Sequence, residues 1–176
     1  MVYIISLIVM AVVLALDLIT KYFAELKSFD FVVIPELLKF ELTYNTGAAF
    51  SFLGNSKWAM PLFITLTIVV LLAILGYFIF CIVKKRKLSK WFAVALSMSF
   101  AGALGNMIDR IAFGKVRDFI YVFYNTDIFP AIFNVADMAL VIGLIMVVIY
   151  FLFLDKEAVF KKGKNKKKEE DAENKG

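Results

Sequence analysis

Two aspartates beside the last two apolar runs of the chain are the residues best suited to chemistry. Asp137 lies near the start of an apolar run over residues 131–154 and is the only charged residue in it. Asp118 precedes it by 19 positions, just beyond the preceding apolar run. A carboxylate in an apolar segment of membrane length is costly, and such residues usually mark functional sites. The presence of both acids therefore needs a functional explanation.

The composition restricts the chemistry that is open to these acids. The 176 residues include no histidine and a single cysteine, Cys81, which lies inside an apolar run. A Ser-His-Asp triad, a Cys-His dyad and an H-E-x-x-H zinc site are thereby excluded. The cysteine has no partner for a disulfide or a metal site, and we interpret it as a small core or lipid-facing residue. We expect no metal and no cofactor.

The residues alone leave open whether the two acids serve proteolysis or transport. If the carboxyl groups of Asp118 and Asp137 meet, their pKa values must split, because two like charges cannot both form cheaply. The ionised group can then take a proton from water while the protonated group polarises a scissile carbonyl, as in an aspartic protease. A carboxylate embedded in a membrane equally suits a proton relay or a small proton-coupled transporter.

Composition and hydropathy place the chain in a membrane. Hydrophobic residues make up 62% of the sequence and the mean hydropathy is +0.83, whereas soluble domains contain about 45–50% apolar residues. Four runs are long enough to cross the hydrocarbon core, which takes about 20 residues. We expect these helices at about 3–24, 58–83, 91–108 and 131–154. The sequence predicts an all-α polytopic domain over residues 1–155 and a disordered cytoplasmic tail over 156–176.

The positions of the lysines predict how the chain is oriented. The net charge is +5, but the lysines gather at 84–90 and in the tail, beside the apolar runs, so we expect no nucleic-acid partner. Both basic stretches should face the cytoplasm under the positive-inside rule. Both termini then lie inside, and the connections 25–57 and 109–130 lie outside. The first run lacks a basic leading region and a clear cleavage site, so we interpret it as a retained helix.

The two outer connections differ in pattern. Residues 31–34 and 37–44 are strand-like and are separated by a turn at Pro35, which predicts a small sheet on the membrane surface. Residues 111–130 are rich in aromatic side chains, which suit the membrane interface and could also line a groove for lipid. The sequence therefore predicts an ordered outer layer next to the two acids.

The first apolar run carries an acid and a base near its outer end. Asp17 and Lys21 are four residues apart and share one helical face, with the acid on the side that favours pairing. One interpretation is an ion pair that offsets its own burial and fixes helix packing. The other is a contact with a lipid headgroup or a neighbouring site residue, since a lysine side chain can extend to the interface.

The outer half of the third run combines small and polar residues. Ala101 and Gly105 form a small-xxx-small pair, which lets another helix approach closely. Asn106, Asp109 and Arg110 share a face at helical spacing. Packing explains the small residues, but it explains three strongly polar ones less well. We expect Arg110 to pair with Asp109 or with another carboxylate near the interface.

Five short strings of residues along the chain form an ordered set. They are Asp17-Leu-Ile-Thr-Lys21, Asn45-Thr-Gly47-Ala-Ala-Phe50, Gly105-Asn106-Met-Ile-Asp109-Arg110, Gly114-Lys-Val-Arg-Asp118-Phe119 and Phe133-Asn134-Val-Ala136-Asp137. The set resembles the motifs of the lipoprotein signal peptidases, or type II signal peptidases, in that family's order. The resemblance spans about residues 1–155, and no motif position departs from the family pattern. One string would be a weak signal, whereas five in order on a chain with four spans are specific.

This resemblance implies a four-helix aspartyl protease of the bacterial cytoplasmic membrane. A small extracytoplasmic sheet and a partly helical loop would flank a site near the extracytoplasmic face. The implied catalytic pair is Asp118 and Asp137. The other matching positions, which bind substrate or support the pair in the family, are Asn45, Gly47, Asn106, Arg110, Asn134, Asp17, Lys21 and Asp109. Asn134 lies three residues before Asp137 and can orient that carboxylate or the peptide.

The resemblance also implies the substrate, a prolipoprotein that carries diacylglycerol on its cysteine. The enzyme would cut on the N-terminal side of that cysteine and release the signal peptide. Such a substrate would arrive laterally through the bilayer, and we expect membrane lipid as the other partner of a monomeric enzyme. Two competing hypotheses remain. One is the small proton-coupled transporter, which inverted repeats would favour, but we see none in this sequence. The other is a non-catalytic assembly subunit whose polar residues serve helix association.

Overall fold

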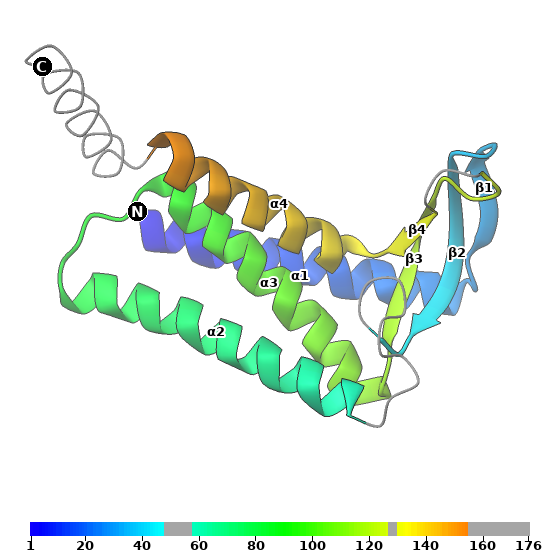
Figure 1. The fold of residues 1–176 in the computed structure, drawn as a ribbon, viewed down its shortest axis with the longest axis horizontal. Coiled ribbons are helices and arrows are strands. Elements are labelled where there is room, and N and C mark those ends of the chain that lie inside the picture. The colour runs from blue at the N-terminus through cyan, green and yellow to red at the C-terminus, as the bar shows by residue number, and fades with distance from the viewer. Residues whose placement is uncertain (48–57, 127–129, 155–176) are drawn as a thin grey trace, which may run out of the picture.

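The structure is a computed structural model that describes residues 1–47, 58–126 and 130–154. Long helices lie side by side, and a small sheet stands at one end of them (Figure 1). The helices are α1 (Val2–Leu26), α2 (Ala59–Val83), α3 (Lys90–Phe113) and α4 (Val135–Ile149), and α4 continues as a π-helical segment over Tyr150–Leu154. All four are long and apolar enough to span a membrane, which confirms the four predicted spans.

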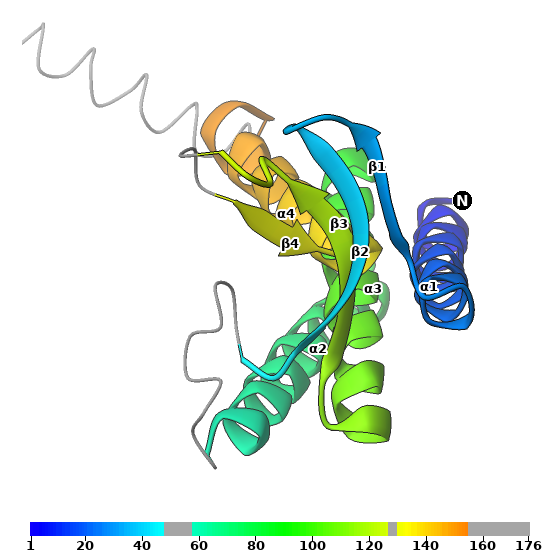
Figure 2. The ribbon, with the colours of Figure 1, turned by 90° about the vertical axis from the view of Figure 1, so that its right-hand side faces the viewer.

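A four-stranded antiparallel sheet joins the two connections at the far end of the helices. Its strands are β1 (Asp30–Ile34), β2 (Leu38–Asn45), β3 (Val116–Val122) and β4 (Ala131–Phe133), and they lie in the order β1-β2-β3-β4. The strands predicted on either side of Pro35 are therefore confirmed. Figure 2 shows the sheet crossing the end of α3, with α1 to one side and α4 to the other. The register places Thr43 opposite Asp118, so β2 lies directly beside the first of the two acids.

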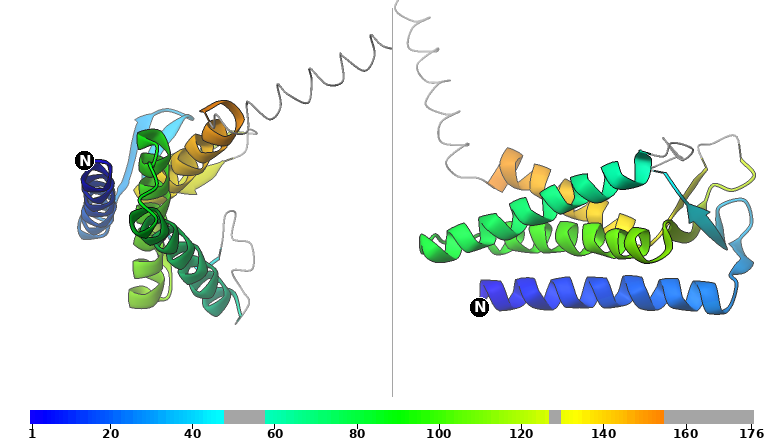
Figure 3. Two further views of the ribbon diagram at one scale, coloured as in Figure 1. Left: turned by 90° about the vertical axis from the view of Figure 1, so that its left-hand side faces the viewer. Right: turned by 90° about the horizontal axis from the view of Figure 1, so that it is seen from below.

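The helix α3 is the centre of the bundle and packs against α1, α2 and α4. Its glycines allow this close approach. A Cβ atom at Gly102 would collide with the backbone of Ala136 and Leu140 on α4, and one at Gly105 would collide with the side chain of Asp17 on α1. The helix α2 diverges from α1 toward the sheet (Figure 3). The bundle is therefore tight around α1, α3 and α4.

The helix α3 extends five residues beyond its predicted end at residue 108. Asp109 and Arg110 lowered the hydropathy and hid this last turn, although both residues are helical. The helix ends at Phe113, where Gly114 adopts a left-handed conformation (φ 67°). Glycine is the usual residue at this position after a helix, so it was the signal that could have located the end.

The predicted helix over 131–154 is wrong at its start. Residues 131–133 form strand β4, and Asn134 is the N-cap of α4. The side chain of Asn134 accepts a hydrogen bond from the backbone of Asp137, while the Asp137 side chain accepts one from the backbone of Asn134. This reciprocal capping box fixes where the helix begins. Hydropathy could not find the boundary, because the strand is as apolar as the helix.

The basic stretch and the chain's first residue lie at the end of the bundle opposite to the sheet (Figure 1). Lys84 follows α2 directly, and Lys90 begins α3. The predicted tail over 156–176 lies outside the described residues. The described parts of the connections at the sheet end contain strands and turns. Residues 48–57 and 127–129, which complete those connections, lie outside the described residues, as does any partly helical loop there.

We expect Gly102→Ala to destabilise the bundle by about 1–3 kcal/mol, because the added methyl group meets backbone atoms of α4 that cannot move aside. Gly76→Ala on α2 is the matched control, since a Cβ atom there has no neighbour within 4 Å and alanine favours a helix. The measurement is thermal unfolding of both purified variants in detergent. Equal unfolding temperatures for the two variants would show that α3 and α4 are not in this close contact.

Candidate active site

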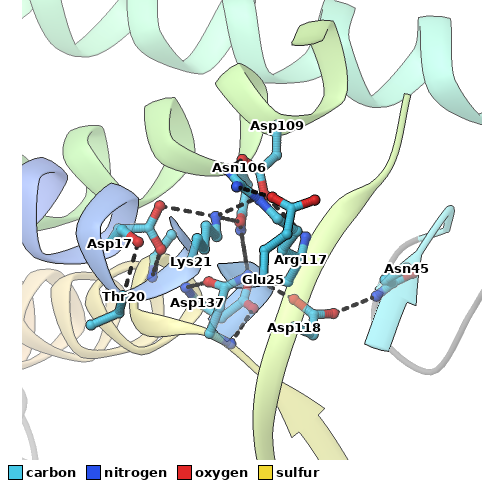
Figure 4. Close-up of polar contacts among 12 residues, drawn as sticks. Asp17, Thr20, Lys21, Glu25, Asn45, Asn106, Asp109, Arg117, Asp118 and Asp137 are labelled. Atoms are coloured by element: carbon cyan, nitrogen blue, oxygen red, sulfur yellow. Dashed lines mark hydrogen bonds and ion pairs between the residues drawn. The ribbon is translucent and has the colours of Figure 1, made fainter. Parts of the chain in front are cut away.

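Asp118 and Asp137 converge where the sheet meets the start of α4. Asp118 projects from β3 and Asp137 from the first turn of α4 (Figure 4). Asn134 bridges them, because its side-chain Nδ2 donates to Asp118 Oδ1 at 2.7 Å and its backbone N donates to Asp137 Oδ2 at 3.1 Å. Both acids line one cavity of about 750 Å³. The structure thus brings together the two acids that the sequence singled out.

Asp137 lies in an environment built to hold an anion. Its Oδ1 accepts a hydrogen bond of 2.7 Å from Asn106 Nδ2, and its Oδ2 accepts the backbone N–H of Asn134. The partial positive charge at the N-terminus of a helix favours a carboxylate in the first turn. The capping box places Asn134 in direct contact with this carboxylate. A single residue therefore positions both acids.

Asp118 is 3% exposed and lies on strand β3, whereas Asp137 lies in the first turn of a helix. Burial, and then the negative charge of Asp137, raise the pKa of Asp118 to about 6. Hydrogen bonds from Asn45 and Asn134 oppose the rise, as does the charge of Lys21. The Asn45 bond joins its Nδ2 to Asp118 Oδ2 at 3.0 Å. Asp118 therefore keeps a proton at a higher pH than an exposed aspartate does.

Asn45 is itself held by the turn that follows β2. Its Oδ1 accepts a hydrogen bond of 2.9 Å from the backbone N of Gly47, which leaves its Nδ2 directed at Asp118. The next residues of this sequence string, 48–50, lie outside the described residues. Asn45 therefore lines the cavity, and Gly47 holds its side chain in place through this hydrogen bond.

Lys21 lies fully buried at the centre of the polar cluster. Its Nζ is 2.9 Å from Asp17 Oδ2 and 3.5 Å from Asp109 Oδ2, and it donates to Asn106 Oδ1 at 2.9 Å. The expected ion pair with Asp17 is confirmed. The alternative, a lysine that extends to a lipid headgroup, is wrong because the side chain is 0% exposed. Lys21 connects α1 to α3 and, through Asn106, to the two acids.

Asp17 has a second role at the start of α4. Its Oδ1 accepts the backbone N–H of Ala136 at 2.9 Å. The first N–H groups of a helix have no partner within the helix and need one from outside. A carboxylate on α1 therefore caps the helix that carries Asp137, and it fixes the distance between the two helices.

The expected pair between Arg110 and Asp109 is wrong. Asp109 is fully buried and binds Arg117, whose Nη2 lies 2.7 Å from Asp109 Oδ1 and whose backbone N donates to Oδ2 at 3.0 Å. Arg117 Nη1 also lies 2.9 Å from Glu25 Oε2 on α1. Adjacent helical residues point in different directions, so Asp109 and Arg110 face different parts of the protein.

Arg110 instead forms part of the cavity wall. Its Nη2 donates to the carbonyl oxygen of Gly47 at 3.4 Å, and its guanidinium lies 5.3 Å from the centre of the Phe63 ring. Its charge acts on Asp137 more strongly than on Asp118. Arg110 is therefore a cation beside the two acids and not a member of the buried ion-pair network.

Sequence reasoning missed Arg117 and Glu25 as supporting residues. Arg117 is adjacent to Asp118 on β3, so its side chain points to the opposite face of the strand, away from the cavity. The alternation of side chains along a strand was the signal that could have identified Arg117 as a residue that holds β3 on the face opposite to the cavity. Nothing in the sequence marked Glu25 as its partner, because the contact depends on how β3 packs on α1.

The cavity has a polar end and an apolar depth. Its polar end is formed by Asn45, Asn106, Arg110, Asp118 and Asp137. Its apolar depth lies between α2 and α4, and it is lined by Leu66, Val70, Met138, Leu140, Val141 and Leu144. No group of three or more metal-binding side chains occurs among the described residues. The arrangement can place a polar bond at the acids while an apolar segment occupies the depth.

A family model described as signal peptidase (SPase) II matches residues 9–153. The chain belongs to the signal peptidase II family. It is therefore an aspartic endopeptidase and a multi-pass bacterial membrane protein, as predicted. Membership of this family removes the two competing hypotheses, the transporter and the non-catalytic assembly subunit.

Relatives and solved structures of similar length agree with this membership. The lipoprotein signal peptidase of Pseudomonas aeruginosa (strain PAO1) is 43% identical over 139 residues, which cover 76% of this chain and 79% of the relative. That of Geobacter metallireducens is 42% identical and covers 77% of this chain and 83% of the relative. A solved structure described as a bacterial membrane enzyme at 2.3 Å resolution has a TM-score of 0.71 and 36% identity, covering 84% of this chain and 87% of that one.

We expect Lys21→Met to destabilise the protein by about 3–5 kcal/mol, because it leaves the buried carboxylate of Asp17 without its cation. Lys39→Met is the control, since Lys39 pairs with Asp30 and Glu41 at the surface of the sheet, and it should leave the unfolding temperature nearly unchanged. Thermal unfolding in detergent measures both. A Lys21→Met protein as stable as Lys39→Met would show that the buried ion pair does not hold the helices together.

Proposed function

We propose that this chain removes the signal peptide from prolipoproteins that carry diacylglycerol on a cysteine, and that it cuts on the N-terminal side of that cysteine. Asp118 and Asp137 form the catalytic pair. The observation that carries the proposal is the single residue Asn134, which binds both carboxyl groups at the polar end of the cavity between α2 and α4. Membership of the signal peptidase II family, whose relatives bear the name lipoprotein signal peptidase, supports it.

The two carboxyl groups supply a complete route for hydrolysis without a metal. One proton is shared between Asp118 and Asp137, because two adjacent like charges do not both form cheaply. The ionised carboxylate takes a proton from water as the water oxygen attacks the scissile carbonyl carbon. The protonated carboxyl gives its proton to the carbonyl oxygen. The tetrahedral intermediate then collapses as the leaving nitrogen is protonated and the C–N bond breaks.

The shape of the cavity supports lateral entry of a lipid-anchored substrate. Two acyl chains and an apolar signal helix keep the substrate in the bilayer, and the apolar depth between α2 and α4 provides a matching surface. The scissile bond then lies at the polar end, beside Asn45 and Arg110. We assign these two residues and Gly47 to the positioning of the peptide. The buried Asn106, Asn134, Asp17, Lys21 and Asp109 support the pair from behind.

We place the enzyme in the bacterial cytoplasmic membrane with both termini in the cytoplasm. The basic residues next to Lys84 and Lys90 lie at the end of the bundle opposite to the sheet, and the positive-inside rule assigns that end to the cytoplasm. Asp118 and Asp137 then lie near the extracytoplasmic face. The catalytic unit is residues 1–155 and works as a monomer in contact with membrane lipid, with 156–176 as a cytoplasmic tail.

We expect Asp118→Asn and Asp137→Asn each to reduce cleavage by about 10³-fold or more, because each removes a carboxyl group that must transfer a proton. Asp30→Asn is the matched control, since the side chain of this acid is 73% exposed at the edge of the sheet. The assay is in vitro cleavage of a diacylglyceryl-modified precursor, with folding checked by circular dichroism. Near-normal cleavage by either folded site variant would refute the proposed mechanism.

We expect the diacylglyceryl-modified precursor to be cleaved at least about tenfold faster than the same precursor without lipid, because burial of each CH₂ group contributes about 0.8 kcal/mol of binding. The two precursors are compared side by side in one detergent. Equal rates would remove the lipid requirement while leaving the protease assignment intact.

A further inference from the structure

The side-chain amide of Asn106, which binds Asp137, has a fixed orientation. Asn106 Oδ1 accepts hydrogen bonds from Lys21 Nζ at 2.9 Å and from Asn134 Nδ2 at 3.0 Å. Its Nδ2, which can only donate, therefore faces Asp137 at 2.7 Å. A neighbouring ammonium polarises this amide and strengthens its donation, since hydrogen bonds in a chain reinforce one another. Asp137 thus accepts a hydrogen bond from an amide that the Lys21 ammonium polarises.

Both oxygens of Asp137 face donors that cannot become acceptors. The second donor is the backbone N–H of Asn134, at the start of α4. The helix N-terminus adds its partial positive charge. Protonation of this carboxylate would weaken two hydrogen bonds and oppose the helix dipole. Each of these features favours the anion.

Asp118 receives less support as an anion. Its partners are the neutral side-chain amides of Asn45 and Asn134, and the Oδ1 of Asn45 is bound to a backbone N–H instead of a cation. The residue lies on a buried strand rather than at a helix terminus. The shared proton is therefore more stable on Asp118 than on Asp137.

The other charged groups around the pair preserve this asymmetry. On α1 and α3, Asp17 and Asp109 both contact Lys21, and Asp109 also binds Arg117, which pairs with Glu25. These three acids and two bases therefore pair mainly with one another. The charge of Lys21 also lowers the pKa of Asp118, but less than the hydrogen bonds from Asn45 and Asn134 do. Among the described residues that line the cavity, the cation is Arg110 on α3, whose charge acts more strongly on Asp137 than on Asp118. The charged surroundings thus favour an anion at the start of α4.

We propose that Asp137 is the ionised member of the pair and acts as the general base, that Asp118 carries the proton and acts as the general acid, and that Asn106 and Asn45 are the positioning residues that maintain this division. The proposal rests on the proposed function and deepens it. It assigns each carboxyl group its own step in the reaction.

The steps then follow with every proton accounted for. Asp137 takes a proton from water as the water oxygen bonds to the carbonyl carbon, and Asp118 gives its proton to the carbonyl oxygen. Asp137 passes the acquired proton to the leaving nitrogen as the C–N bond breaks. One hydroxyl of the intermediate returns its proton to Asp118 as the new carboxyl group forms. The pair ends in the state in which it began.

The assignment predicts how kcat/KM depends on pH, with an acidic limb and an alkaline limb that reflect the two protonation states the reaction needs. Activity requires Asp118 protonated and Asp137 ionised. With burial as the main cause, the pKa of Asp118 is raised to about 6, so kcat/KM should fall about tenfold per pH unit above that region as the proton is lost. At lower pH the pair takes up a second proton, and activity falls again on an acidic limb.

Two substitutions separate the limbs. Asn45→Leu removes a donor from the Asp118 anion, so the proton is held more tightly and the alkaline limb moves up by about one pH unit. Asn106→Leu removes a donor from the Asp137 anion, so the acidic limb moves up by a similar amount. The measurement is kcat/KM for a diacylglyceryl-modified precursor across pH. Asp30→Asn serves as the control and should keep the parent profile.

The opposite pattern would overturn the assignment, with Asn45→Leu moving the acidic limb and Asn106→Leu the alkaline limb. Unmoved limbs, or limbs that move together, would also overturn it, because a purely structural role changes rates and not these positions. If Asn106→Leu fails to fold, Asn45→Leu alone decides, since Asn45 lies in the cavity wall outside the buried network. Failure of the proposed function is distinct, because it would appear as cleavage by Asp118→Asn.

Discussion

The burial of the Lys21 ammonium is the interaction on which the rest of the structure depends. A fully buried cation is stable only if its charge and its three donors are satisfied. Asp17, Asp109 and Asn106 provide those partners from α1 and α3. The requirement fixes the two helices in register, and it explains why α3 has glycine where Asp17 packs. The close packing of α1 on α3 therefore depends on these buried polar residues.

The same network determines where the two acids lie. Asp17 caps the start of α4, Asn106 binds Asp137, and Arg117 fixes β3 against Asp109. Each acid therefore projects from an element that is held at its base by a buried ionic or polar contact. The proposed catalytic pair needs such a rigid support, because small displacements of reacting groups are costly. The support is continuous from the first helix to the last.

Much of this could be predicted from the sequence, for physical reasons that differ between residues. Asp137 was recognisable because a charge in an apolar helix is costly, and Asp17 with Lys21 because helical spacing pairs them. The partner of Asp109 was not recognisable, since Arg117 reaches it only after the helix has ended at Gly114 and the chain has reversed into a strand. The start of α4 was missed because hydropathy cannot separate an apolar strand from an apolar helix.

The helix α2 takes almost no part in the polar network, so the two sides of the cavity are held by different kinds of contact. In the described part of the chain it contributes the Phe63 ring beneath Arg110 and cavity-lining side chains such as Leu66 and Val70. The positions of the two carboxyl groups therefore do not depend on polar contacts with α2. One wall of the cavity is fixed by buried ionic and polar contacts among α1, α3, α4 and the sheet, whereas the wall formed by α2 is held mainly by apolar packing.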